Sequence, residues 1–124
     1  MPVRCLIVDD NSVFLEGAAD LLGREGLDVV GVASNSGEAF RLAEKLRPDV
    51  TLVDVDLGEE DGLELGRRLT SGSDGVRCPV IMISTYAEAD LGQMAERVPV
   101  AGFVRKTRLS GAAIHAVLAA AGDR

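Results

Sequence analysis

The chain has 124 residues, of which 47% are hydrophobic and 27% charged, so it can bury the core of one ordinary domain and is not disordered. Its 20 acidic residues outnumber its 13 basic residues, and the net charge of −7 argues against direct contact with nucleic acid or an anionic membrane. Because no apolar run could span a bilayer, no signal-peptide cleavage site is evident and only Cys5 and Cys78 are cysteines, we expect a cytoplasmic, single domain over residues 1–124.

The first half of the chain alternates short apolar runs with amphipathic stretches. Residues 5–8 form an apolar run closed by acids, which is typical of a strand buried on both faces. A helix follows, because apolar residues recur at helical spacing at Phe14, Ala18, Leu21 and Leu22. Residues 29–33 are the second strand, and Ser36 is the expected N-cap of the next helix. Residues 50–53 form a third strand that ends at Asp54.

The second half repeats the same alternation. A helix over residues 62–69 precedes a fourth strand over residues 79–83, with proline at its first position. Another helical stripe is formed by Leu91, Met94, Ala95 and Val98. A fifth strand over residues 101–104 leads to a last helix capped by Ser110. Five β–α units in strict alternation predict a doubly wound α/β fold, a five-stranded parallel sheet with helices on both faces.

Polar side chains gather where the predicted strands end. Every strand except the second is followed by such groups, namely Asp9, Asp10, Asp54, Asp56, Ser84, Thr85 and Lys106. One acid after a strand is most often a helix cap or a solvated loop residue, but this set combines several acids with a hydroxyl and an amine. Open parallel sheets bind ligands at this edge. Carboxylates held close together repel one another, and a hard cation such as Mg²⁺ relieves that repulsion.

The chain resembles the receiver domain of two-component response regulators, with the CheY-like fold. The resemblance rests on Val8-Asp9-Asp10-Asn11, the run from Pro48 to Asp54, Asp61-Gly62-Leu63-Glu64, Ile83-Ser84-Thr85 and the run from Ala101 to Lys106. It covers essentially the whole chain and keeps the family's intervals between acidic pair, phosphoacceptor, hydroxyl and lysine. The resemblance implies the strand order 2-1-3-4-5.

The resemblance implies that the protein is a signalling switch rather than an enzyme with a separate substrate. Asp54 would accept a phosphoryl group from a histidine kinase or a phosphotransfer protein. Mg²⁺ would be held by Asp10, Asp54, the backbone carbonyl of Asp56 and, partly through water, Asp9. Lys106 would neutralise charge on the phosphoryl oxygens, and Ser84 would hydrogen-bond one of them.

Several positions depart from the family pattern or border the expected site. Thr107 follows the lysine where many receivers have a proline, so we expect a trans bond there, and Gly58 replaces another usual proline. Phe103 stands at the aromatic switch position, where an ordinary core aromatic is the alternative interpretation. Thr85 is small enough to leave the acceptor accessible. Tyr86 is expected to shield the aspartyl phosphate from water.

Two other classes of protein share parts of this pattern. Asp54 and Asp56 also resemble the D-x-D motif of haloacid-dehalogenase-type phosphatases, but that family places the motif after its first strand. A flavodoxin-like electron carrier has the same fold, yet Asp9 and Asp10 would repel the phosphate that its first loop must bind.

The output of the signal is left open by the sequence. The chain is either a stand-alone domain that acts by protein contact or the receiver of a longer regulator with a DNA-binding domain. Residues 29–33 and Lys106-Thr107 resemble receivers that precede LuxR-type output domains. A homodimer that forms on phosphorylation is also left open.

Overall fold

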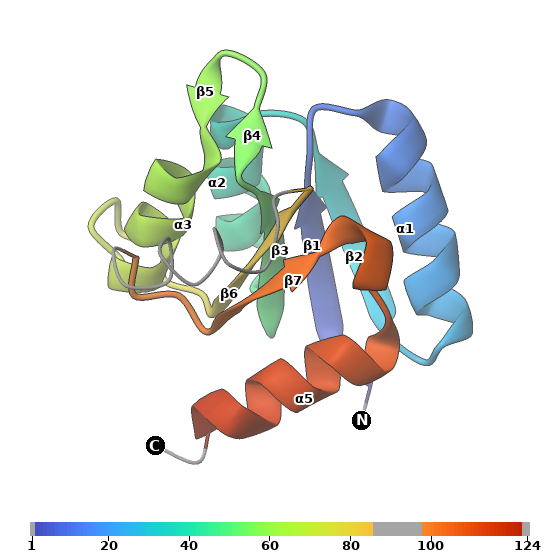
Figure 1. Cartoon of the computed structure of the whole chain (residues 1–124). Helices are drawn as coiled ribbons and strands as arrows, with labels where there is room; N and C mark the ends of the chain where they lie inside the picture. Colours follow the sequence, from blue (N-terminus) through green and yellow to red (C-terminus); the bar gives the residue numbers. More distant parts are fainter. Residues whose placement is uncertain (1, 86–97, 123–124) are drawn as a thin grey trace.

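The computed structural model describes residues 2–85 and 98–122. Its main sheet has five strands, all parallel to their neighbours, in the order β2-β1-β3-β6-β7 (Figure 1). The strands are β1 (Arg4–Val8), β2 (Asp28–Ala33), β3 (Val50–Asp54), β6 (Val80–Ser84) and β7 (Gly102–Arg105). In chain order this is the predicted arrangement 2-1-3-4-5, which is therefore confirmed.

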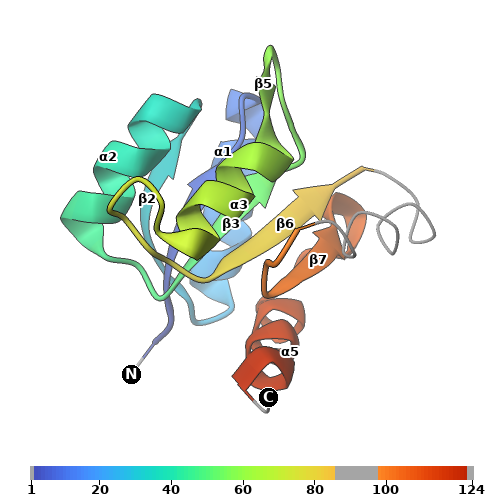
Figure 2. The ribbon, with the colours of Figure 1, turned by 90° about the vertical axis from the view of Figure 1, so that its left-hand side faces the viewer.

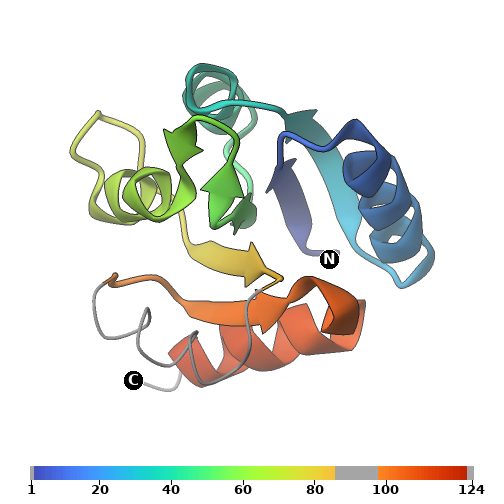
Figure 3. The same ribbon diagram turned by 45° about the horizontal axis from the view of Figure 1, so that its top comes forward.

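Helices cover both faces of the sheet. The helices α1 (Ser12–Arg24) and α5 (Gly111–Gly122) pack on one face, and α2 (Ser36–Leu46) and α3 (Gly62–Ser71) pack on the other (Figures 2 and 3). The helix predicted around Leu91 and Met94 lies outside the described residues.

The central strands β1, β3 and β6 are largely apolar because both faces of the sheet are buried there. In β1, Cys5 and Ile7 belong to the core beneath α1 and α5, whereas Leu6 and Val8 belong to the core beneath α2 and α3. Successive side chains of a strand point to opposite faces, so two cores require an unbroken apolar run. Burial raises the pKa of the Cys5 thiol to about 12, and the nearby Cys78 adds to this effect, so Cys5 is an uncharged core residue.

The structure adds a small element that the sequence did not predict. Strands β4 (Asp56–Leu57) and β5 (Glu60–Asp61) form a two-stranded antiparallel hairpin between β3 and α3. In Figure 1 this hairpin stands above the ends of the parallel strands, close to the start of α2.

Some predicted boundaries were wrong by one residue. Asn35, rather than Ser36, caps α2, because its side chain accepts a hydrogen bond from the N–H of Glu38. Strand β6 begins at Val80 rather than at Pro79.

After β7, residues 106–108 form a short 3₁₀ turn. No peptide bond among residues 2–85 and 98–122 is cis, in agreement with the trans bond expected at Thr107.

Candidate functional site

The ends of β1, β3, β6 and β7 lie at the top of the sheet in Figure 1. Residues at these ends line a pocket of about 360 Å³. Its lining contains most of the predicted site residues, namely Asp9, Asp10, Asp54, Asp56, Thr85 and Lys106, together with Asn11 and Gly58. Ser84 is buried at the end of β6 and does not line the pocket. Phe103 is partly buried against the core beneath α2 and α3. Tyr86 lies outside the described residues.

Lys106 joins two of the predicted acids. Its Nζ lies 2.7 Å from Oδ2 of Asp9 and 3.0 Å from Oδ2 of Asp54. Asp9 is fully buried, and the side chain of Lys106 is only 16% exposed. Burial by itself disfavours the charged ammonium, but the bonds to Asp9 and Asp54 outweigh burial and raise the pKa of Lys106. Lys106 therefore carries a positive charge at neutral pH.

Asp54 occupies an unfavourable position for a negative charge. It is buried at the end of β3, and burial raises the pKa of its carboxyl group above the usual value. Lys106 and the N–H of Asp56, which donates to Asp54 Oδ1 at 3.1 Å, act in the opposite direction, while the charge of Asp9 adds to the rise. Two buried carboxylates thus share one ammonium, so the negative charges in the site outnumber the positive ones.

The donor set suits a hard divalent cation. Carboxylate oxygens of Asp9, Asp10 and Asp54, one from each, lie within 4.8 Å of one another, and Asp10 is exposed to solvent. Mg²⁺ takes oxygen ligands and keeps several waters, so it needs a few carboxylates at an open edge. An added cation would also offset the excess negative charge. The residues present therefore fit Mg²⁺.

Short-range backbone interactions fix these acids in place. The N–H of Asn11 donates to Asp9 Oδ1 at 2.9 Å, and the Asn11 side chain caps α1. After the β4–β5 hairpin the chain returns close to the end of β3. A Cβ on Gly62 would therefore lie 1.8 Å from the carbonyl oxygen of Asp54. Only glycine fits there, which explains the physical need for Gly62 in the motif Asp61-Gly62.

One contact was missed at the level of sequence. The ammonium of Lys106 lies over the ring of Phe14, 4.3 Å from its centroid. A cation over an aromatic face is stabilised by the ring's quadrupole. Phe14 was predicted only as an apolar residue of α1, and its helical spacing carries no sign of a partner in a distant turn.

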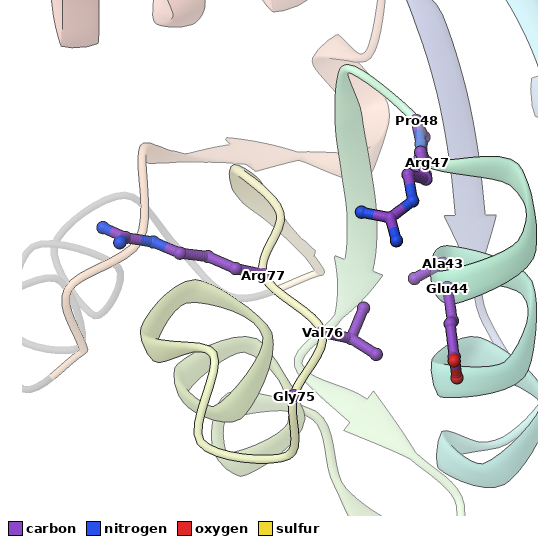
Figure 4. A pocket seen from close by; sticks show the side chains of 7 residues that line it. All are labelled: Ala43, Glu44, Arg47, Pro48, Gly75, Val76 and Arg77. Carbon is purple, nitrogen blue, oxygen red and sulfur yellow. The ribbon is translucent and has the colours of Figure 1, made fainter.

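A second pocket lies at the opposite end of the sheet, where α2 ends before β3. It has a volume of about 80 Å³ and is lined by Ala43, Glu44, Arg47, Pro48, Gly75, Val76 and Arg77. Figure 4 shows the Arg77 side chain extending away from Ala43, Glu44 and Val76, so the two arginines do not converge on one point. This pocket therefore lacks the convergent polar groups that mark the first one.

Comparison with known proteins gives the family. Residues 5–118 match the model of the response regulator receiver domain. The chain belongs to this family, which confirms the resemblance and decides against the phosphatase and flavodoxin alternatives.

Individual relatives agree with this membership. The chain is 32% identical to the transcriptional regulatory protein LnrK of Bacillus subtilis, over 94% of this chain and 52% of that protein. It is 37% identical to a protein-glutamate methylesterase/protein-glutamine glutaminase of Nocardioides sp., over 69% of this chain and 23% of that protein. A LuxR-family two-component response regulator from Aurantimonas sp. superposes with a TM-score of 0.81 at 25% identity, over 100% of this chain and 88% of that one. This chain thus spans about half or less of the curated relatives' length.

Within residues 2–85 and 98–122, no helix combines the length and the hydropathy needed to cross a membrane.

Proposed function

We propose that this receiver domain accepts a phosphoryl group on Asp54 from the phosphohistidine of a histidine kinase or phosphotransfer protein. The observation that carries the proposal is the placement of Lys106 Nζ, 3.0 Å from Asp54 and 2.7 Å from Asp9, at a pocket open to solvent. In the transfer, an Asp54 carboxylate oxygen forms a bond to phosphorus while the bond between phosphorus and the histidine nitrogen breaks. The product is an acyl phosphate on Asp54.

The residues around Asp54 have distinct proposed roles. Lys106 is already charged, so it can neutralise a phosphoryl oxygen without a proton transfer. Asp10, Asp54 and the backbone carbonyl of Asp56 would hold Mg²⁺, and Asp9 would act partly through water. When bound, Mg²⁺ supplies the positive charge that phosphoryl transfer requires.

Three further roles belong to residues at the end of β6 and in β7. Ser84 would hydrogen-bond a phosphoryl oxygen, and Thr85, which is exposed at the pocket, leaves the acceptor accessible. Phe103 would respond by changing its packing. Its partly buried position against the α2 and α3 core is compatible with such a movement.

The acceptor is tested by phosphorylation with acetyl phosphate and Mg²⁺. Intact-mass spectrometry should show one added phosphoryl group that hydroxylamine removes, and Asp54→Asn should abolish it. Asp28→Asn, an exposed acid at the opposite end of the sheet, is the matched control and should react like the wild type. Site mapping that locates the phosphoryl group of the wild-type protein on another residue would contradict the assignment.

The output is proposed to be a protein contact or a covalently linked output domain. LnrK is a transcriptional regulatory protein, and this chain matches about half of its length, which supports a regulator with a DNA-binding part elsewhere. The methylesterase relative shows that similar receiver segments also occur in an enzyme. We assign this domain itself the role of a switch, with dimerisation on phosphorylation as one route of output.

A further inference from the structure

The β4–β5 hairpin is tied to the start of α2 by the side chain of Glu60. One carboxylate oxygen accepts a hydrogen bond from the backbone N–H of Ser36 at 2.9 Å, and the other accepts from the Ser36 hydroxyl. Ser36 is the first residue of α2, where backbone N–H groups lack partners within the helix. The hydroxyl and the N–H together hold the pKa of Glu60 below its usual value, so the carboxylate is charged at neutral pH.

The same hairpin forms one wall of the candidate metal site. Its turn contains Gly58, which has a φ of 65°, and a Cβ at this position would lie 3.0 Å from Oδ2 of Asp10. Asp56 opens the hairpin and pairs with Asp61 in β5. The position of the hairpin therefore decides where the backbone of Asp56 and Gly58 stands relative to Asp10.

The hairpin needs support from outside itself. Each of its strands has only two residues, and a two-stranded hairpin is marginally stable in water. Leu57, next to the turn, is buried, but Gly58 and Glu59 in the turn are exposed. The contact between Glu60 and Ser36 supplies support of this kind from the start of α2.

We propose that Glu60 and Ser36 are positioning residues that hold the hairpin against Asp10 and thereby preorganise the Mg²⁺ site. Neither residue lines the site pocket, so both act through the backbone that carries Asp56 and Gly58. The inference rests on the proposed function for the identity of the metal. Residues that hold metal ligands in place commonly change metal affinity about 10–100-fold when they are replaced.

The test is a Mg²⁺ titration followed by amide NMR shifts at constant ionic strength. Glu60→Ala should weaken Mg²⁺ binding about tenfold, at the lower end of the range for such residues. Glu59→Ala is the matched control, because it removes the same charge from the same hairpin, and its effect should be much smaller. Ser36→Ala keeps the backbone bond, so its loss of Mg²⁺ affinity should lie between those of Glu59→Ala and Glu60→Ala. Ser36→Thr keeps the hydroxyl and should bind Mg²⁺ with the affinity of the wild type.

Two further measurements separate positioning from general destabilisation. Without metal, the N–H of Ser36 should exchange with solvent faster in Glu60→Ala than in Glu59→Ala. Adding Ser36→Ala to Glu60→Ala should cause no further loss of Mg²⁺ affinity. Urea unfolding checks that each variant is folded, and Glu60→Gln, which is expected to keep much of the contact and the affinity, is the second variant if Glu60→Ala does not fold.

The possible failures are distinguishable. If the wild type binds Mg²⁺ and Glu60→Ala weakens binding no more than Glu59→Ala, the positioning role is wrong and the proposed function stands. A lower unfolding free energy with unchanged Mg²⁺ affinity would likewise overturn it. If the wild type binds no Mg²⁺, or if Asp10→Ala binds it equally well, the proposed metal site itself is wrong.

Discussion

Lys106 pairs with two buried carboxylates at once, and this shared ion pair determines how a substitution at either acid affects stability. Its ammonium contacts both Asp9 and Asp54, so the two carboxylates share one cationic partner. Replacing one partner of a buried ion pair is usually destabilising, because the other charge is left without compensation. Here the loss of Asp54 still leaves Lys106 paired with Asp9.

We therefore expect Asp54→Asn to make the metal-free protein more stable. The pKa of Asp54 is raised by burial and by Asp9, so the ionised carboxylate costs folding free energy at neutral pH. A gain of about 1 kcal/mol corresponds to a rise in Tm of roughly 4 °C for a domain of this size. Thermal unfolding at pH 7 in EDTA measures it.

The pH dependence of the stability difference between Asp54→Asn and the wild type gives an internal control. A carboxyl group with a raised pKa in the folded state costs stability above that pKa and none below its usual value of 3.8. The difference between Asp54→Asn and the wild type should thus narrow as the pH falls through the raised pKa toward 3.8. A difference that is constant or grows on acidification would show that ionisation of Asp54 is not its cause.

At the scale of single elements, the junction between β3 and α3 depends on Gly62. Gly62→Ala should unfold the junction or destabilise the domain by several kcal/mol, roughly 3 or more, because its Cβ would overlap the Asp54 carbonyl. Gly17 lies inside α1 with open space around it, so Gly17→Ala should stabilise the domain by about 1 kcal/mol. Urea unfolding of both variants makes the comparison. Equal effects of the two substitutions would show that the close approach at Gly62 is not limiting.

The sequence predicted those elements whose signal is local. The five strands were evident because two buried faces leave no alternation, and the acids that line the pocket were evident because they follow those strands. The hairpin was missed, since Asp56, Leu57, Glu60 and Asp61 form strands too short for any periodicity. The contacts of Phe14 with Lys106 and of Glu60 with Ser36 were missed because they join residues far apart in the chain.

At the scale of the whole molecule, metal binding and folding should be linked. Mg²⁺ that binds only the folded state, at ten times its Kd, should add about 1.4 kcal/mol to the unfolding free energy. Asp10→Ala should lose this increment, and Asp9→Ala should lose less of it, since Asp10 is exposed at the pocket whereas Asp9 is buried against Lys106. Urea unfolding with MgCl₂, against NaCl of equal ionic strength, measures the increment. An equal increment in the wild type and in Asp10→Ala would contradict the site.

Strand β1 lies between β2 and β3 in the sheet, although it is made before either of them. At 5–20 residues per second, the ribosome needs roughly 2 to 9 s to add the residues from the end of β1 to the end of β3, and until then one edge of β1 is open. An apolar strand with an open edge readily pairs with another chain. Arg4 precedes this apolar run, and Asp9 and Asp10 follow it directly. Charges at such positions oppose aggregation, so we expect the two acids at the pocket to protect the nascent strand as well.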